Sequence, residues 1–227
     1  MSTDNALAAV VFDLDGTLVD SAGDLRAASN ALLAELGRPP LDLATIKSFI
    51  GDGVAKLEER VLEASGGVPE QAVERMLLRR FLDIYEADPS SRTRPYPGVV
   101  ETLQALRSQG LKLGICTNKP IIATQRLLDD LGLRPLVDAV VGGDSFPSRK
   151  PSPEPLLGLL AMLRVAPARA AMVGDNEHDV AAARAAAVAK VLIMRHGYSR
   201  VPLERLDHDG VLDSFSDLPG RLFEGGA

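Results

Sequence analysis

The sequence predicts an α/β protein: a Rossmann-like parallel sheet core with helices on both faces, plus an inserted all-helical cap domain. Beyond residue 94, short apolar runs alternate with helical patterns, as expected of strand–helix–strand units in a parallel sheet. One further strand pattern, residues 7–12, stands apart from the others. It is separated from them by residues 20–93, where the apolar spacing is helical. We therefore expect a core domain of residues 1–19 and 94–227 and a cap domain of residues 20–93.

The expected strands are short, nearly continuous apolar runs, which are typical of strands covered on both faces. They are residues 7–12, 111–116, 137–141, 170–173 and 191–194. The helices expected to alternate with them are residues 99–108, 121–131, 153–163 and 180–187. In such a sheet, ligands bind beyond the carboxyl ends of the strands. The polar residues that follow each strand are therefore the candidates for a functional site.

The expected cap consists of helices separated by glycine and proline breaks. They are residues 25–36, 43–49, 54–64 and 70–87. In the last of these, Met76, Leu77, Phe81 and Ile84 recur at helical spacing, and we expect them to form its buried side.

Composition excludes several classes of function. The net charge of −6 and the sequence pI of about 5.2 argue against nucleic-acid and anionic-membrane partners. The single cysteine, Cys116, excludes an internal disulfide and a cysteine-rich zinc site, and its apolar surroundings place it in the core. No long apolar span occurs, and residues 1–5 lack the basic and apolar parts of a signal peptide. We expect a cytoplasmic monomer or homodimer.

Two carboxylates, Asp13 and Asp15, follow the first expected strand, and Gly16 comes next. If the backbone stays extended through Asp15, both side chains point to the same side of the sheet. Two carboxylates held close together repel each other, so this arrangement is costly without a cation between them. Taken alone, the pair is better explained as a solvated acidic turn. Further polar residues elsewhere in the sequence are needed to favour a metal site.

Three further polar groups follow later strands. They are Thr117 with Asn118, Lys150 before Pro151, and Asp175 with Asp179. Each has a plain structural explanation on its own, as a turn or helix cap, a solvated loop lysine, or a capping carboxylate. Their common place at the strand ends of one sheet favours a site instead. Acids, a hydroxyl, an amide and a cation together suit a phosphoryl group bound with Mg²⁺.

The carboxylates have expected roles in metal binding and catalysis. Mg²⁺ prefers carboxylate, carbonyl and water oxygens, so Asp13, Asp175 and the backbone carbonyl of Asp15 are the candidate metal ligands. Asp13 is the candidate nucleophile and would form an aspartyl-phosphate. Asp15 is the candidate general acid and base, because the leaving alkoxide needs a proton and the attacking water must lose one.

The remaining polar residues are expected to hold the phosphate and support the metal. Thr117, Asn118 and nearby backbone amides would bind phosphate oxygens. Lys150 would offset the repulsion between a carboxylate nucleophile and a phosphate dianion. Asp179 is expected to orient the metal shell or Lys150 rather than to bind the metal directly. His178 is expected to be exposed and not to be a ligand.

The motifs Asp-x-Asp-Gly-Thr, strand-Thr-Asn, Lys-Pro and Gly-Asp-x-x-x-Asp occur in this order, beginning at Asp13 and ending at Asp179. They resemble the motifs of the haloacid dehalogenase-like phosphatases, and the resemblance spans nearly the whole chain. The insertion after the first motif is similar to the helical cap domain of that family. Shorter strings resemble the subfamily that hydrolyses 2-phosphoglycolate; they begin at Ile50, Arg94, Thr117, Val141 and His196. The resemblance implies Mg²⁺-dependent hydrolysis of a small phosphorylated metabolite, with Asp13 as nucleophile and Asp15 as acid and base.

The cap contributes one candidate contact to the substrate, the turn formed by Gly51, Asp52 and Gly53. It opens a helix and could present its amides to a substrate carboxylate, or it could simply start the helix. Two positions depart from the family pattern: Asn176 stands where serine is common, and Ala187 where a glycine commonly ends the helix.

Two other functions remain open on the sequence alone. The same site could act on a sugar phosphate or pyrophosphate, or catalyse a phosphosugar mutase reaction, because fold does not settle function. A phospho-acceptor signalling domain also combines clustered acids, a threonine and a lysine on a parallel sheet. The helical insertion argues against that alternative, since a signalling acceptor needs no lid that excludes water.

Overall fold

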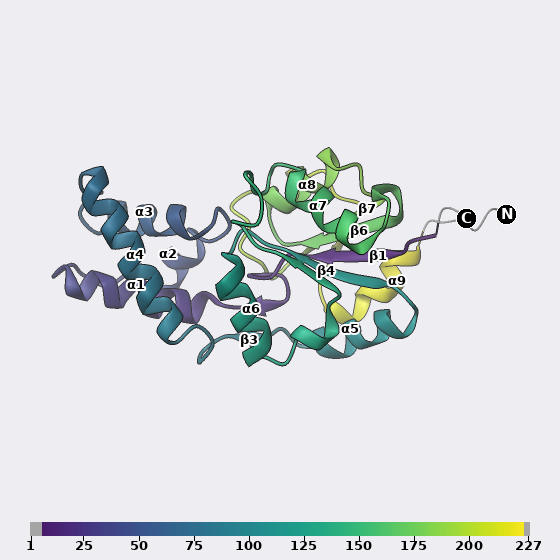
Figure 1. Ribbon diagram of the computed structural model, residues 1–227, viewed down its shortest axis with the longest axis horizontal. Coiled ribbons are helices and arrows are strands. Elements are labelled where there is room, and N and C mark those ends of the chain that lie inside the picture. Colours follow the sequence, from purple (N-terminus) through teal and green to yellow (C-terminus); the bar gives the residue numbers. More distant parts are fainter. Residues whose placement is uncertain (1–5, 225–227) are drawn as a thin grey trace.

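A six-stranded parallel sheet forms the centre of the larger lobe in the computed structural model, which describes residues 6–224 (Figure 1). The strand order is β5-β4-β1-β6-β7-β8. The strands are β1 (Ala9–Phe12), β4 (Lys112–Cys116), β5 (Ala139–Val141), β6 (Ala170–Gly174), β7 (Lys190–Met194) and β8 (Gly210–Leu212). The predicted α/β fold class is confirmed. Residues 1–5, on which the expectation about a signal peptide rests, lie outside the described residues.

Helices cover both faces of this sheet (Figure 1). They are α5 (Val99–Ser108), α6 (Ile121–Asp130), α7 (Glu154–Leu163), α8 (Glu177–Ala185) and α9 (Leu218–Phe223). Alternate residues of β1 belong to different apolar clusters, as the pleat of a strand requires. Val10 and Phe12 share a cluster with residues of α5, α6 and α9, whereas Ala9 and Val11 share one with residues of α7 and α8. Cys116 is buried in the second cluster, as predicted.

The register of the sheet brings three strand ends together. Phe12 of β1 lies opposite Ile115 of β4 on one side and Val173 of β6 on the other. After β5 the chain crosses to the other side of β1 to form β6, so β1 lies at a topological switch point. Ligands bind beyond the strand ends at such points. The residues that follow β1, β4 and β6 are therefore neighbours in space.

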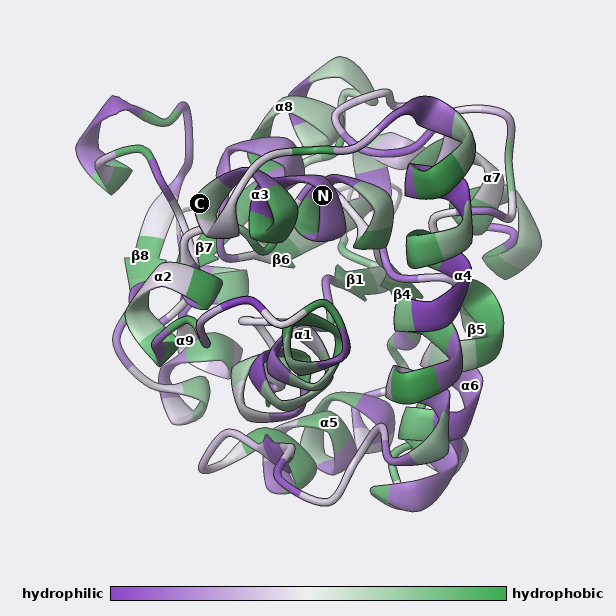
Figure 2. Ribbon diagram, turned by 90° about the vertical axis from the view of Figure 1, so that its left-hand side faces the viewer, coloured by the Kyte–Doolittle hydropathy of each residue, from purple (hydrophilic) through white to green (hydrophobic). Residues whose placement is uncertain are grey.

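Residues between β2 (Val19–Asp20) and β3 (Arg94–Pro95) form a separate helical lobe, at the left of Figure 1. Its helices are α1 (Ala22–Glu35), α2 (Leu43–Lys47), α3 (Val54–Ser65) and α4 (Gln71–Ala87). They share a third apolar cluster, which includes Leu32, Val61 and Phe81. Viewed from this end of the molecule, the helical lobe lies in front of the sheet (Figure 2).

Two short connections join the lobes. β2 and β3 pair antiparallel, with Val19 opposite Pro95. Beside them the buried carboxylate of Asp24 in α1 accepts hydrogen bonds from the backbone amides of Arg92 and Thr93 and, at 2.6 Å, from the Thr93 hydroxyl. The returning chain is therefore fixed against the start of α1.

Several local predictions were wrong. Met76 is 70% exposed, because the buried stripe of α4 runs through Phe81 and Tyr85 and Met76 lies on the opposite side of the helix. β1 ends at Phe12, as predicted, but it begins at Ala9, two residues later than predicted. α8 starts three residues earlier than predicted, because Asn176 and Asp179 form a capping box. The pairing of β2 with β3, the strand β8 and the helix α9 were not predicted.

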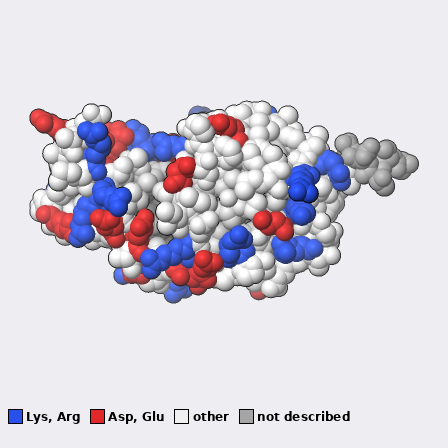
Figure 3. All heavy atoms as spheres, in the orientation of Figure 1, with Lys and Arg blue, Asp and Glu red and all other residues white. Residues whose placement is uncertain are grey.

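Figure 3 shows basic and acidic side chains interspersed over one face, with no large area of a single charge. Among residues 6–224, no helix has the length and apolar character needed to cross a membrane.

Candidate active site

The chain turns sharply just after β1 and so places its two carboxylates at the strand end. The Asp13 amide donates to the Val173 carbonyl and extends the β1–β6 ladder by one bond. The amides of Leu18 and Val19 both donate to the Leu14 carbonyl and close a tight loop. Gly16 has a φ of 90° in this loop, and a Cβ there would lie 2.5 Å from Asp175 Oδ2. Glycine is thus required by both backbone conformation and space.

Lys150 joins two of the predicted carboxylates. Its ammonium lies 2.7 Å from Asp13 Oδ1 and 2.6 Å from Asp179 Oδ1, and all three side chains are buried. Asp179 Oδ2 accepts hydrogen bonds from the amides of Asp175 and Asn176. Both oxygens of Asp179 therefore have partners, and its position orients Lys150.

Asp175 is held at the end of β6 by donors from three segments. Its Oδ1 accepts from the Thr17 hydroxyl and the Asn176 side-chain amide, and its Oδ2 accepts from the Tyr198 amide at 2.6 Å. Asp13, Asp175 and Asp179 each present a carboxylate oxygen, and these oxygens all lie within 4.8 Å of one another. Asn176 and Asp179 also form the capping box that begins α8, so the same residues cap the helix and form the site.

The carboxylates of this cluster lie in surroundings that oppose their negative charge. Burial raises the pKa of Asp13 to about 6, and the neighbouring carboxylates of Asp179 and Asp15 add to the effect, while Lys150 opposes it. Burial likewise raises the pKa of Asp175. Buried carboxylates that are disfavoured in their charged form in this way are typical of sites that a metal ion completes. An all-oxygen donor set fits a hard divalent cation.

Residues after β4 connect the helical lobe to the lobe that holds the sheet. The Thr117 amide donates to the Val141 carbonyl, and the Thr117 hydroxyl accepts from the Lys119 amide. The Asn118 side-chain nitrogen donates to the carbonyls of Gly51 and Lys150, both at 2.9 Å. Asn118 therefore connects the loop that contains Gly51 with the loop that contains Lys150. The sequence analysis did not predict this bridging role.

Lys119 is a site residue that the sequence analysis did not select, although it lies within one of the strings that carry the family resemblance. Its buried ammonium lies 3.1 Å from Asp15 Oδ2 and 4.7 Å from the centre of the Tyr85 ring. Burial lowers the pKa of Lys119, but the attraction of Asp15 and Tyr85 outweighs it and keeps the group protonated. The tertiary contact with α4 could not be read from the sequence.

The turn that begins α3 contacts the core through a network of ion pairs. Asp52 lies 2.7 Å from Arg200 and 2.6 Å from the Nε2 atom of His178, and it also pairs with Arg60 of α3. Burial opposes ionisation of Asp52, but the two arginines outweigh it and lower its pKa to about 2. His178 is only partly exposed and contacts Asp52, so its predicted exposure was wrong.

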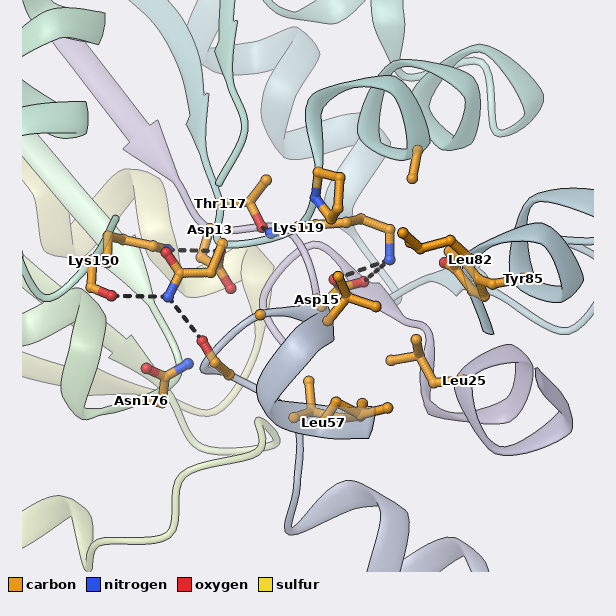
Figure 4. A pocket seen from close by; sticks show the side chains of 17 residues that line it. Asp13, Asp15, Leu25, Leu57, Leu82, Tyr85, Thr117, Lys119, Lys150 and Asn176 are labelled. Atoms are coloured by element: carbon orange, nitrogen blue, oxygen red, sulfur yellow. Dashed lines mark hydrogen bonds and ion pairs between the residues drawn. The ribbon is translucent and has the colours of Figure 1, made fainter. Parts of the chain in front are cut away.

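The residues after β1 and β4, together with the helical lobe, enclose a cavity of about 50 Å³ (Figure 4). The catalytic candidates Asp13 and Asp15 line it, as do Thr117, Asn118 and Lys150. Gly51 and Gly53 also line it, whereas Asp52 does not. Apolar side chains from the helical lobe, including Leu25, Leu57 and Leu82, complete the walls. Most of the predicted residues thus line one cavity, whereas Asp175 and Asp179 do not line it, although Asp179 pairs with Lys150.

Comparison with known families agrees with this geometry. The family model described as haloacid dehalogenase-like hydrolase matches residues 7–187. This range includes the turn after β1, the loop after β4 and the acidic end of β6. The chain therefore belongs to the haloacid dehalogenase-like hydrolase family, and it is a hydrolase with a phosphatase site.

Similar proteins cover nearly the same length. A phosphoglycolate phosphatase of Cereibacter sphaeroides is 45% identical over 213 residues, which are 94% of this chain and 96% of that protein. A phosphoglycolate phosphatase of Rhodospirillum rubrum is 44% identical over 214 residues, 92% of this chain and 88% of that protein. A solved structure described as a predicted phosphoglycolate phosphatase from Haemophilus somnus superimposes with a TM-score of 0.89 at 30% identity, covering 94% of this chain and 97% of the other.

Proposed function

We propose that the protein is a Mg²⁺-dependent phosphomonoesterase that hydrolyses 2-phosphoglycolate to glycolate and phosphate through an aspartyl-phosphate at Asp13. The observation that carries the proposal is the environment of Asp13. One of its oxygens is held by Lys150, while the other accepts no hydrogen bond from residues 6–224. A carboxylate oriented by one oxygen and free at the other, beside a cavity, is suited to nucleophilic attack. The substrate follows from the relatives that carry this activity in their names.

Mg²⁺ would be held by Asp13, Asp175 and the backbone carbonyl of Asp15. The shared position of the Asp13 and Asp175 carboxylates, at the ends of adjacent strands, supports this assignment. Asp179 supports the site from behind through Lys150 and the amides that begin α8. When bound, the ion supplies positive charge that offsets the repulsion between the nucleophile and the phosphate oxygens.

In the first step, the free oxygen of Asp13 attacks phosphorus, and the bond between phosphorus and the ester oxygen breaks. Asp15 donates a proton to the departing oxygen, which leaves as the alcohol group of glycolate. In the second step, Asp15 takes a proton from a water molecule whose oxygen attacks the phosphorus of the aspartyl-phosphate. Inorganic phosphate is released and the Asp13 carboxylate is restored.

The phosphate oxygens that do not react would be held from the ends of two strands. Lys150 lies beside Asp13 and contributes positive charge where those oxygens gather. Thr117 and Asn118 line the same cavity and follow β4. Because the side-chain nitrogen of Asn118 already has two carbonyl partners, we expect its backbone amide to serve the phosphate.

Residues 20–93 would act as a cap over this site, and residues 1–19 and 94–227 as the core. The support is that α1, α3 and α4 each contribute a wall of the cavity, through Leu25, Leu57 and Leu82 respectively. A closed cap excludes bulk water during phosphoryl transfer. Gly51 and Gly53 remain candidates for contact with the substrate through their amides, because they line the cavity.

The proposal is tested by steady-state phosphate release with Mg²⁺ across 2-phosphoglycolate, several sugar phosphates and pyrophosphate. We expect a kcat/KM for 2-phosphoglycolate well above that for every other compound. Weak turnover of all of them would leave a phosphatase with another substrate. Phosphorylation of the protein without release of more phosphate than protein present would indicate a phospho-acceptor instead.

A further inference from the structure

The cavity has an ammonium group at each end. Lys150 lies beside Asp13, at the end where phosphoryl transfer is proposed. Lys119 extends in the other direction, between Asp15 and the Tyr85 ring of α4 (Figure 4). Among residues 6–224, the Lys119 ammonium pairs with Asp15 and makes no hydrogen bond to Asp13 or Asp179. The two lysines therefore serve different parts of the site.

The surroundings of Lys119 leave it able to bind an anion. An ammonium has three N–H donors. One direction is taken by the Asp15 carboxylate, at 3.3 and 3.1 Å from its two oxygens, and another faces the Tyr85 ring at 4.7 Å. A third direction remains for a ligand in the cavity that Lys119 lines.

The walls near Lys119 strengthen any charge interaction made there. The side chains that the helical lobe contributes to the cavity are mainly apolar, among them Leu25, Leu57 and Leu82. Lys119 itself is only 4% exposed at its side chain. In an enclosed, poorly hydrated setting, an ion pair is stronger than at a surface, and an unpaired partner is costly.

We propose that Lys119 is the residue that determines specificity for an acid substrate, by binding the carboxylate of a small phosphorylated acid while Lys150 faces its phosphate. This inference rests on the proposed function and adds to it the recognition of the second anionic group. It accounts for a second buried ammonium in a site where phosphoryl transfer employs only Lys150. Asp15, between the two lysines, then lies near the ester oxygen that joins the two halves of the substrate.

The test compares two substrates in the variant Lys119→Met. One is 2-phosphoglycolate, and the other is 2-hydroxyethyl phosphate, in which an uncharged hydroxymethyl group replaces the carboxylate. The variant removes any effect of Lys119 on Asp15, and this change affects both substrates equally. Only 2-phosphoglycolate also loses the positive partner of its carboxylate. We expect the ratio of their kcat/KM values to fall by about 100-fold, the effect of truncating one partner of a buried ion pair.

Two further variants complete the experiment. Lys119→Gln keeps a donor for Asp15 and should lower the ratio in the same way, so the result does not depend on the folding of Lys119→Met. Lys56→Met changes a cap lysine that pairs with Glu59 and does not line the cavity, and it should leave the ratio unchanged. Thermal unfolding checks that each variant is folded.

The outcomes separate this inference from the proposed function. Equal losses on both substrates would show that Lys119 acts only through Asp15 and would overturn the inference, while the preference of the wild type for 2-phosphoglycolate would still support the proposed function. A wild type that does not prefer 2-phosphoglycolate over 2-hydroxyethyl phosphate would overturn both.

Discussion

At the scale of single residues, Glu58 in α3 has an environment that opposes its charge. It is buried, and its Oε1 atom has no hydrogen-bond partner among the described residues. Burial raises its pKa to about 7, with smaller contributions from the charges of Glu74 and Glu59. The folded protein therefore keeps a proton that the unfolded chain releases near its ordinary pKa of 4.5. The contribution of this group to stability is complete below that pH and is lost as the pH rises to about 7.

We predict that Glu58→Gln raises the free energy of unfolding by about 2 kcal/mol at pH 8, and by much less at pH 4. Urea unfolding at the two pH values measures the difference. Glu63→Gln, an exposed position of the same helix, is the matched control and should change neither value. An equal effect of Glu58→Gln at both pH values would contradict the raised pKa of Glu58.

Ala187 holds a backbone conformation that suits glycine. Its φ is 54°, in the left-handed region, just beyond the end of α8. The alanine therefore keeps the shape that a glycine would give this helix end, at a cost of about 1 kcal/mol. We predict that Ala187→Gly stabilises the protein by about that amount in thermal unfolding. Ala185→Gly, at an exposed helical position, should instead destabilise it by about 1 kcal/mol. Destabilisation by both variants would argue against strain at Ala187.

At the scale of elements, the loop between α2 and α3 attaches the helical lobe to the lobe that holds the sheet. Gly51 accepts a hydrogen bond from Asn118, and Asp52 pairs with Arg200 and His178. Because the pKa of Asp52 is lowered to about 2, its ion pairs stabilise the fold above the ordinary pKa of 3.8 and are lost only as the pH falls toward 2. The attachment should therefore persist throughout the range in which most phosphatase assays are made.

We predict that Asp52→Asn loosens this loop. The amides of residues 51–54 should exchange their hydrogens about tenfold faster, because each tenfold change corresponds to about 1.4 kcal/mol of local opening free energy. Hydrogen exchange followed by mass spectrometry measures the effect. Asp83→Asn, which removes an exposed partner of Arg79 in α4, is the control. Unchanged exchange at the loop would mean that the ion pairs do not hold the cap.

The same elements show what a sequence can predict. Asp13, Thr117 and Asp175 were found because each directly follows an apolar strand, and parallel strands bring their ends to one edge. Asp52 was predicted only as part of a turn that could contact the substrate. Its ion pair with Arg200 and the contact of Lys119 with Tyr85 have no local signal, since these partners lie on distant segments.

Short elements were missed for a related reason. The pairing of β2 with β3 and the strand β8 involve two or three residues each, too few for a periodic pattern. Met76 fits an apolar pattern but lies on the exposed side of α4, because only packing against the neighbouring helices decides which stripe is buried. The prediction of the fold class did not depend on these short elements or on which side of α4 is buried.

At the scale of the whole molecule, the acidic cluster links metal binding to folding. A ligand that binds only the folded state stabilises it by about 2.7 kcal/mol when its concentration is 100 times its Kd. The Asp13, Asp175 and Asp179 carboxylates come from two strand ends and a helix, so the unfolded chain does not assemble them.

We predict that Mg²⁺ raises the unfolding temperature by several degrees in the absence of any substrate. The increase should be absent in Asp175→Asn and should remain in Asp83→Asn, which alters an exposed carboxylate of α4. Differential scanning calorimetry with and without Mg²⁺ makes the comparison. If Mg²⁺ raised the unfolding temperature of Asp175→Asn as much as that of the wild type, the ion would have to bind at a site that does not include Asp175.

The most direct test of the proposed mechanism is to trap the phosphoryl group on the protein. ³²P-labelled 2-phosphoglycolate is mixed with the enzyme and Mg²⁺, turnover is stopped with acid within milliseconds, and the labelled peptide is identified. We predict label on Asp13, with no label and no turnover in a folded Asp13→Asn variant. Rapid phosphate release without label on the protein, or label on a residue other than Asp13, would contradict the mechanism.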